Sequence, residues 1–290
     1  MATLGTFDGF HRGHALLFEK LEECAGKYNL PPVVITFHPH PRMVVTPANP
    51  PLLLTTTEEK VEILSQWFRG SLIILNFNSA FRKMTADDFA NNILISKIGI
   101  KALVVGFNHS FGHDRSGNIE HLKEIGQKDG FDVEVVGPVS YKEMPISSSR
   151  IRRALTAGEW TDAINMLGHP YSIRGRVVRG LGRGRSLGWP TLNLEWSPRK
   201  LLPPSGVYSC LVDIDSSQYK GMMFIGINML NPQKKLSVEA HVFDFEGNLY
   251  DREVTLYPMH FIRENARFES TSLLSQQIAK DKQTVLGLLK

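Results

Sequence analysis

Gly5-Thr6-Phe7-Asp8-Gly9-Phe10-His11-Arg12-Gly13-His14 stands near the start of the chain, between a short apolar segment and a run from Ala15 to Cys24 whose apolar residues have helical spacing. A glycine turn before a helix is typical of an anion site, because unpaired backbone N–H groups and the positive end of the helix dipole converge there. Two histidines spaced H-x-G-H add imidazoles that suit a phosphate chain undergoing reaction. The stretch therefore predicts a phosphate site at the start of this helix.

The composition is that of a globular protein with room for two domains. The chain has 290 residues, of which 42% are hydrophobic and 21% charged, so each of two domains can bury its own core. The formal net charge is +4, and lysines and arginines form no long run. Phosphorylated small molecules account for this mildly basic balance as well as nucleic acid does, so we expect no nucleic-acid partner.

Cysteine usage and hydropathy indicate a cytoplasmic location. Cys24 and Cys210 lie far apart in apolar contexts, which predicts reduced thiols. No stretch approaches the ~18 apolar residues of a membrane span, and no basic region followed by an apolar run predicts a signal peptide. We expect no membrane partner, and the sequence leaves the oligomeric state open.

Strand-like and helix-like segments alternate along the first half. After a very short opening strand, strands are predicted at 32–37, 71–77, 102–106 and 131–136, and helices at 57–68, 85–98 and 116–129, with Thr57 and Thr85 as N-caps. This alternation predicts a Rossmann-like α/β domain, with a parallel sheet, helices on both faces, and ligands at the carboxyl ends of the strands.

A break in pattern separates the two halves. A helical pair at 149–157 and 159–167 ends at Gly168-His169-Pro170. Beyond it come glycines and short alternating strands at 171–178, 207–214, 221–227, 237–243 and 254–258, followed by a helix at 273–289. The sequence therefore predicts two domains, 1–168 and 169–290, the second a small antiparallel β-barrel with a terminal helix.

Two polar stretches follow predicted strands of the first half. Pro39 and Pro41 fix the backbone around His40, after the second strand. The stretch 105–117, after the fourth strand, includes Asn108 and Arg115. Both stretches fall at the edge of the sheet where ligands bind.

A third stretch carries hydroxyl groups into a helix. Residues 146–152 read Ile-Ser-Ser-Ser-Arg-Ile-Arg, and their hydroxyl and N–H groups, together with Arg152, would hold triphosphate oxygens. The alternative is that Ser149 is an ordinary N-cap and Arg152 a solvated helix residue.

These stretches keep their order over residues 5–152 and resemble the adenylyltransferase half of bacterial bifunctional riboflavin kinase/FAD synthetases, nucleotidyltransferases with an H-x-G-H signature. The resemblance implies that the FMN phosphate attacks the α-phosphorus of ATP and releases pyrophosphate, catalysed by placement and charge stabilisation. His11 and His14 would stabilise the phosphates and Arg152 the leaving pyrophosphate. It further implies ATP contacts at Gly5, Phe7, Asp8, Gly9, Gly13, Ser147, Ser148 and Ser149, and flavin contacts at His40, Asn108 and Arg115.

A glycine-rich stretch in the second half predicts a second phosphate site. Gly180, Gly184 and Arg185 precede Trp189-Pro190-Thr191-Leu192-Asn193, and glycines let a backbone approach phosphate closely. Thr191 and Asn193 are oxygen donors two residues apart in an extended segment, so they lie on one face. Neutral oxygens together with nucleotide phosphates suit Mg²⁺.

This stretch resembles the riboflavin kinase signature G-R-x-L-G-x-P-T-x-N-L, and residues 204–208 and 238–245 also match that family. The resemblance implies phosphorylation of riboflavin by ATP with Mg²⁺. Glu239 matches the family's catalytic base, which takes a proton from the ribityl hydroxyl, and Arg263 lies in its flavin-side segment. We expect Glu239 to face inward; the alternative is an outward charge on an alternating strand.

The chain departs from these families at a few positions, which keeps other functions open. Asn108 and His109 stand where the family has an aspartate and an aromatic residue, and a loop at 224–230 differs from its relatives. The preferred hypothesis is a bifunctional enzyme that converts riboflavin to FMN and FMN to FAD. The alternatives are a riboflavin kinase with a decayed adenylyltransferase half, and a non-catalytic flavin-binding or sensing protein.

Overall fold

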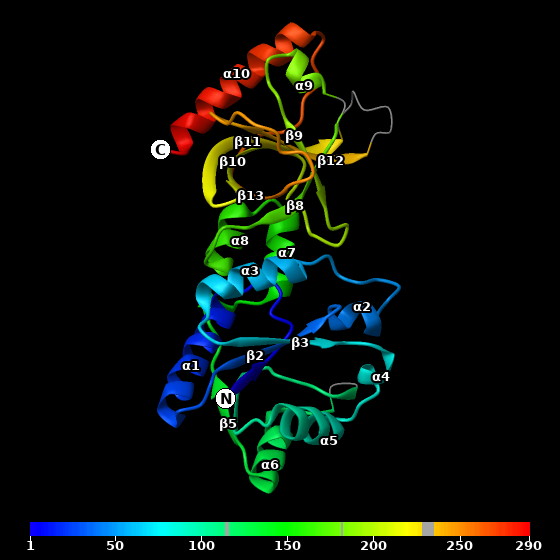
Figure 1. Ribbon diagram of the computed structural model, residues 1–290, viewed down its shortest axis with the longest axis vertical. Coiled ribbons are helices and arrows are strands. Elements are labelled where there is room, and N and C mark those ends of the chain that lie inside the picture. The colour runs from blue at the N-terminus through cyan, green and yellow to red at the C-terminus, as the bar shows by residue number, and fades with distance from the viewer. Residues whose placement is uncertain (114–115, 181, 228–234) are drawn as a thin grey trace. The chain divides into compact units, whose positions relative to one another are not determined.

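The computed structural model describes residues 1–113, 116–180, 182–227 and 235–290, which pack as two compact units, Met1–Ser148 and Ser149–Lys290 (Figure 1). Helices α7 (Ser148–Thr156) and α8 (Trp160–Leu167) group almost entirely with the second unit. The predicted division at 168/169 assigns them to the first domain, and which domain they serve stays a prediction. Arg115 and the last part of the loop at 224–230 lie outside the described residues.

The first unit is built on the predicted parallel sheet. Its five strands lie in the order β3-β2-β1-β4-β5 and all pairs are parallel. The short opening strand is central in this order, so the loop that follows it leaves from the middle of the sheet. The strands are β1 (Ala2–Leu4), β2 (Val33–His38), β3 (Ser71–Asn76), β4 (Ala102–Gly106) and β5 (Asp132–Val136).

Helices cover both faces of this sheet, as predicted (Figure 1). On one face, α1 (Arg12–Tyr28) and α3 (Thr57–Trp67) bury Leu21 and Leu64. On the other, α5 (Ala86–Phe89), the π-helix η1 (Ala90–Ile98) and α6 (Ile119–Asp129) bury Leu94 and Leu122. Short helices α2 (Pro41–Val45) and α4 (Ser79–Arg82) and a hairpin, β6 (Ser140–Tyr141) and β7 (Met144–Pro145), complete the unit.

Two helix predictions need correction. The helix predicted at 85–98 is capped by Thr85 as expected, but after Phe89 it widens into a π-helix, whose backbone hydrogen bonds span five residues instead of four. The N-cap of α3 is Thr56 rather than Thr57. Thr56 and Glu59 form a reciprocal capping box, which fixes the helix start one residue earlier.

The second unit is the predicted antiparallel barrel. It closes in the order β10-β11-β12-β9-β8-β13. The strands are β8 (Ile173–Val178), β9 (Leu192–Trp196), β10 (Gly206–Ile214), β11 (Ser217–Ile227), β12 (Leu236–Val242) and β13 (Glu253–Arg263). The terminal helix α10 (Thr271–Leu288) packs Val285 against Met222 and Phe243 of the barrel. A short helix, α9 (Arg183–Ser186), lies in the glycine-rich stretch.

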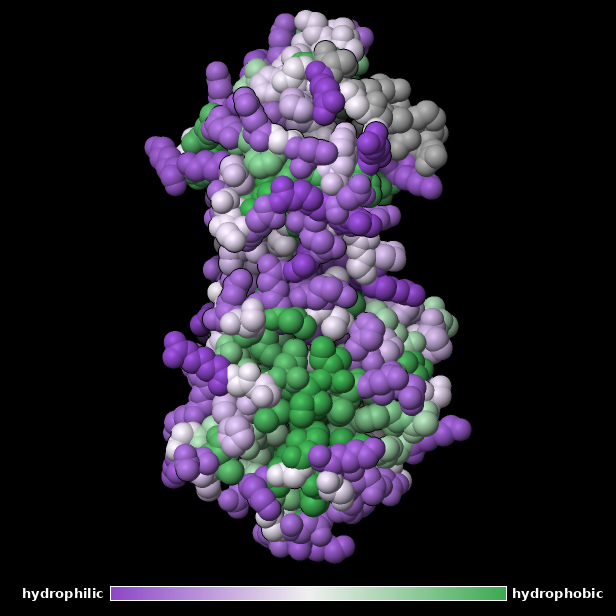
Figure 2. Space-filling model, viewed as in Figure 1, coloured by the Kyte–Doolittle hydropathy of each residue, from purple (hydrophilic) through white to green (hydrophobic). Residues whose placement is uncertain are grey.

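The surface of the first unit carries an apolar region around its edge strand β3 (Figure 2). This strand has no charged residue, and Ile74 on it is 40% exposed. Edge strands commonly carry a charged residue or a proline that discourages pairing with other chains, and β3 carries neither.

Candidate active sites

The loop between β1 and α1 is held in place by a buried carboxylate. Asp8 is 1% exposed, and its carboxylate accepts hydrogen bonds from the backbone N–H of Leu54 at 3.2 Å and of Thr55 at 2.9 Å. The Thr55 hydroxyl in turn accepts from the backbone N–H of Gly9 at 3.0 Å. Because its carboxylate is engaged in this way, Asp8 shapes the loop, and a contact with ATP phosphates would have to come from its backbone.

His11 and His14 come together at the start of α1. Their rings stack with centroids 3.6 Å apart, and His11 is the N-cap residue of the helix. Burial, His11 and Lys60 hold the pKa of His14 well below its usual 6.5, so this imidazole is neutral at pH 7. Phe7 packs edge-on against His14 and is buried, so its side chain belongs to the core. Gly5, Gly9 and Gly13 lie in the same loop and helix start.

Lys60 is a member of this site that the sequence analysis missed. Its side chain is 5% exposed, and its ammonium donates to the Thr6 carbonyl at 2.6 Å. Burial lowers the pKa of Lys60, while the Asp8 carboxylate opposes that change. The loop therefore encloses a buried cation close to two imidazoles, an arrangement that favours an anionic ligand.

One residue of the serine stretch 146–152 bonds to the loop between β1 and α1. The Ser148 hydroxyl donates to the Asp8 carbonyl at 2.8 Å, and Ser147 precedes it. Ser149 and Arg152 lie on α7 in the second unit. Their predicted contacts with the phosphates of ATP stay predictions.

The residues predicted to bind flavin lie in different surroundings: His40 is buried and hydrogen-bonded, whereas Asn108 is exposed. His40 is buried and caps α2, because its Nδ1 accepts from the Arg42 backbone N–H at 3.1 Å. Asn108 is exposed after β4. Its neighbour His109 stacks on Phe111 with centroids 5.8 Å apart, and burial lowers the pKa of His109 to about 4.

The barrel brings two predicted site residues directly opposite each other. Asn193 on β9 pairs with Glu239 on β12 in the antiparallel register, so their side chains stand side by side on one face. Val238 and Ala240 flank Glu239 and are buried in the barrel, whereas Glu239 is only half-buried. The expectation that Glu239 faces inward is therefore wrong: strand alternation places the Glu239 and Asn193 side chains on the outer face.

The glycine-rich stretch packs tightly against this outer face. A Cβ on Gly180 would overlap the side-chain amide of Asn193, and a Cβ on Gly184 would overlap the Trp189 carbonyl and come within 3.1 Å of the Thr191 hydroxyl. Only glycine leaves space there for the two predicted metal ligands. Arg185 is exposed on α9, and the Ser237 hydroxyl bonds to Glu239 at 3.2 Å.

Thr191 and Asn193 carry oxygens of the kind that Mg²⁺ takes. Threonine and asparagine oxygens are hard ligands, and Mg²⁺ takes few protein ligands when nucleotide phosphates supply others. Among the described residues, no group of three or more histidine, cysteine, aspartate or glutamate side chains is arranged to hold a metal. That Thr191 and Asn193 hold this ion stays a prediction.

Arg263 is engaged within the barrel unit. Its guanidinium forms two-pronged hydrogen bonds of 2.8 to 3.1 Å with the Asp281 carboxylate on α10, and it lies over the Phe268 ring at 5.7 Å. The Gln277 amide also donates to Asp281. Arg263 thus fastens the end of β13 to the terminal helix, and its predicted contact with flavin stays a prediction.

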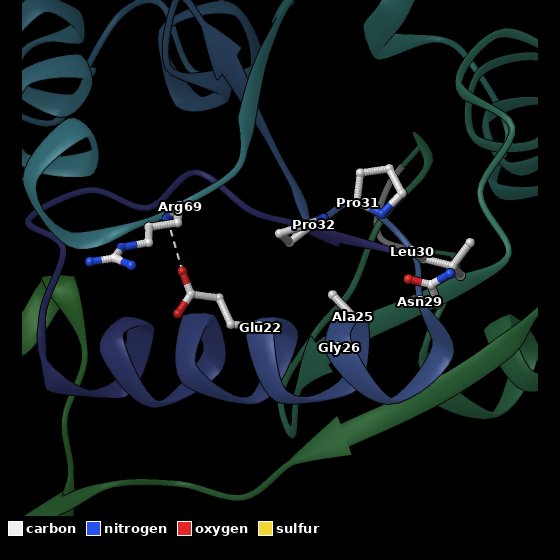
Figure 3. A pocket seen from close by; sticks show the side chains of 8 residues that line it. All are labelled: Glu22, Ala25, Gly26, Asn29, Leu30, Pro31, Pro32 and Arg69. Atoms are coloured by element: carbon white, nitrogen blue, oxygen red, sulfur yellow. Dashed lines mark hydrogen bonds between the residues drawn. The ribbon is translucent and has the colours of Figure 1, made fainter.

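An open pocket lies away from these residues (Figure 3). It is formed by the last turns of α1, the segment before β2, and Arg69, whose backbone N–H donates to the Glu22 carboxylate at 2.9 Å. The pocket is at the amino ends of the strands, opposite the edge where ligands of parallel sheets bind. None of the predicted site residues lines it.

Comparisons with known proteins cover both units. The FAD synthetase family model matches residues 1–150 and the riboflavin kinase family model matches residues 167–289. A bifunctional riboflavin kinase/FMN adenylyltransferase of Buchnera aphidicola is 36% identical over 98% of this chain and 92% of its own length. The proteins of that name from Pseudomonas fluorescens and Escherichia coli K12 are 35% and 33% identical, over 97% and 99% of this chain and 90% and 93% of their own lengths.

A solved structure agrees with the fold along nearly the whole chain. It is described as a macrolide-efflux protein from Streptococcus pneumoniae, and it matches with a TM-score of 0.86 and 34% identity, over 98% of this chain and 93% of that one. In the part of the chain that the structure describes, no helix is long and apolar enough to cross a membrane. On its two matched domains and its full-length relatives, this chain belongs to the family of bifunctional riboflavin kinase/FMN adenylyltransferases.

Proposed function

We propose that this chain makes FMN from riboflavin and ATP in its barrel and FAD from FMN and ATP in its α/β unit. The observation that carries this proposal is the pairing of Asn193 with Glu239 beneath the glycine-rich stretch, in a chain that also retains His11 and His14 at the start of α1. One half produces the substrate of the other. A cytoplasmic location fits its two free, buried cysteines.

In the kinase step, Glu239 acts as the general base. Its carboxylate takes the proton of the terminal ribityl hydroxyl while that oxygen attacks the γ-phosphorus of ATP, and ADP leaves with the former bridging oxygen. Thr191 and Asn193 would hold Mg²⁺, which when bound neutralises charge on the ATP phosphates. Gly180 and Gly184 leave the space in which the phosphates approach these oxygens.

In the adenylyltransferase step, an oxygen of the FMN phosphate attacks the α-phosphorus of ATP and pyrophosphate leaves. No covalent intermediate with the protein is needed, so catalysis comes from placement and charge stabilisation. A neutral His14 has one N–H to donate to a phosphate oxygen, and no described residue bonds to its Nδ1. Lys60 and the N-terminus of α1 add positive potential, and Arg152 would bind the leaving pyrophosphate.

A single assay tests both activities. Purified protein is incubated with riboflavin, ATP and Mg²⁺, and riboflavin, FMN and FAD are separated by chromatography. We expect FMN followed by FAD. FMN alone would indicate that the changes at Asn108 and His109 have abolished the second step, and bound flavin without turnover would indicate a sensor.

Two variants assign the steps to the two units. Glu239→Gln is expected to abolish FMN formation from riboflavin and to spare FAD formation from supplied FMN. His14→Ala is expected to do the reverse. Equal loss of both activities in either variant would contradict the assignment to separate sites.

A further inference from the structure

His241 stands next to the proposed kinase site without a role in the chemistry described so far. It lies on β12 two residues after Glu239, so its side chain emerges on the same outer face of the barrel. Leu236 to Val242 pair with β11 along their whole length, which makes this part of β12 a rigid element. A side chain on it can therefore hold a neighbouring loop at a fixed place.

The imidazole of His241 bonds to the segment that carries Thr191. Its Nδ1 lies 2.7 Å from the Pro190 carbonyl oxygen. That oxygen can only accept, so His241 donates and Nδ1 carries the hydrogen. The ring of His241 also packs edge-on against Trp189, with centroids 5.4 Å apart.

The same segment is fastened at two further points. The Trp189 indole N–H donates to the Ser275 hydroxyl on α10 at 3.0 Å, and the Trp189 backbone N–H donates to the Gly184 carbonyl at 2.8 Å. His241 is the contact nearest to Thr191, because the carbonyl that it holds belongs to the peptide bond that begins that residue.

We propose that His241 is a positioning residue of the kinase site, which fixes the Thr191 segment at a set distance from Glu239 through its bond to the Pro190 carbonyl. The inference rests on the proposed kinase function. A single strand then carries both the general base and the group that places a predicted metal ligand. Thr191 is predicted to hold the Mg²⁺ of Mg-ATP, so a shift of its segment should weaken Mg-ATP binding and raise the KM for Mg-ATP.

The environment of His241 keeps this donor neutral. Burial and the Lys282 ammonium lower its pKa, while the bond to Pro190 and the Asp244 carboxylate oppose that change. Lys282 lies over the Phe243 ring at 4.9 Å, on the same side of the barrel. A neutral amide can therefore replace the imidazole, provided that its N–H group occupies the position of Nδ1.

Three substitutions separate this role from simple packing. In His241→Asn the side-chain amide nitrogen takes the position of Nδ1 and can restore the bond. In His241→Gln it takes the position of Nε2 and cannot, and His241→Ala removes the donor. His260→Ala is the matched control, because His260 makes its ring bond to Ser209 on a different strand pair.

Two readouts are measured on the full-length protein. The first is the KM for Mg-ATP in riboflavin phosphorylation, counted as total FMN plus FAD, with adenylylation of supplied FMN as internal control. The second is the NMR resonance of the Trp189 indole N–H without nucleotide. We expect the Ala and Gln variants to raise this KM by about 10-fold or more and to shift the indole resonance. The Asn variant and His260→Ala should stay within about threefold of wild type in this KM and keep the resonance in place.

The outcomes are decisive whether or not the Ala variant folds. If Asn and Gln behave alike, or if all three variants keep the wild-type KM and resonance, the inference is overturned. Wild-type protein that forms no FMN would instead refute the proposed kinase function, so the two failures are distinguishable.

Discussion

Charge is handled in opposite ways at the two candidate sites. At the start of α1, Asp8 and Lys60 are 1% and 5% exposed, and both are tied to backbone groups of neighbouring loops. On the barrel, Glu239 and Asn193 are half-buried on the outer face of strands whose alternate residues fill the interior. The first site is part of the core of its unit, whereas the second lies on the surface of a barrel that closes without it.

From this difference we expect mutations at the two sites to affect different properties of the protein. Buried charges are costly unless paired, so removing one at the first site leaves its partners without compensation and lowers stability along with activity. Glu239 and Asn193 are only half-buried and lie outside the barrel interior, so substitutions there should reduce activity and leave stability nearly unchanged. The following variants test that contrast.

The largest effect on riboflavin phosphorylation is expected from Gly180→Ala. Its new methyl group would displace the Asn193 amide, and we expect riboflavin phosphorylation to fall by about 100-fold or more. The barrel should unfold at nearly the wild-type temperature, measured by circular dichroism. Gly287→Ala, on α10 with no atom near the added methyl group, is the control. A Gly180→Ala protein with full kinase activity would refute the proposed placement of Asn193.

Asp8→Ala should combine both losses in the α/β unit. It leaves the Leu54 and Thr55 N–H groups without their acceptor, at about 1–3 kcal/mol each, and it leaves Lys60 without a neighbouring anion. We expect the free energy of unfolding to fall by about 3 kcal/mol or more, FAD formation to be lost, and FMN formation to persist. Asp132→Ala, at an exposed position, is the control. Unchanged denaturant unfolding would show that the first site is not part of the core.

Variants of Arg263 and Asp281 test whether Arg263 docks α10 on the barrel or binds flavin. Breaking a largely buried ion pair costs about 3 kcal/mol, and Asp281 is 3% exposed. If Arg263 serves only to dock α10, Arg263→Met and Asp281→Asn should destabilise the barrel by similar amounts and raise the KM for riboflavin equally. A KM that rises only in Arg263→Met would instead support the contact with flavin predicted from the sequence.

The sequence singles out individual site residues, but it does not predict their arrangement. The roles of Thr191, Asn193 and Glu239 stay predictions, and the pairing of Asn193 with Glu239 depends on how the barrel closes. Strand alternation shows that Glu239 and Val238 face opposite ways, and only the closed barrel shows which of them is inside. For this reason the predicted inward direction of Glu239 was wrong.

Residues buried by distant loops were the hardest to predict. Lys60 follows two glutamates at a helix start, which is the usual composition of a solvated first turn. It is buried because the loop around Thr6 and Asp8, some fifty positions earlier, folds over it. The ion pair of Arg263 with Asp281 was not predicted for a similar reason. Asp281 lies on α10, and the sequence alone does not show how this helix packs on the barrel.

The smallest expected effect is a pH dependence of the stability of the α/β unit that comes from the buried imidazole of His109. Its pKa falls from about 6.5 in the unfolded chain to about 4 in the fold, so the unfolded state binds more protons between these values and stability falls as the pH falls. From pH 7 to pH 5 the loss amounts to about 2 kcal/mol. His109→Phe, which restores the aromatic residue of the family, should remove this part of the pH dependence of urea unfolding. His113→Phe, an exposed position in the same loop, should retain it; equal slopes in all three proteins would show that His109 titrates as freely in the folded unit as in the unfolded chain.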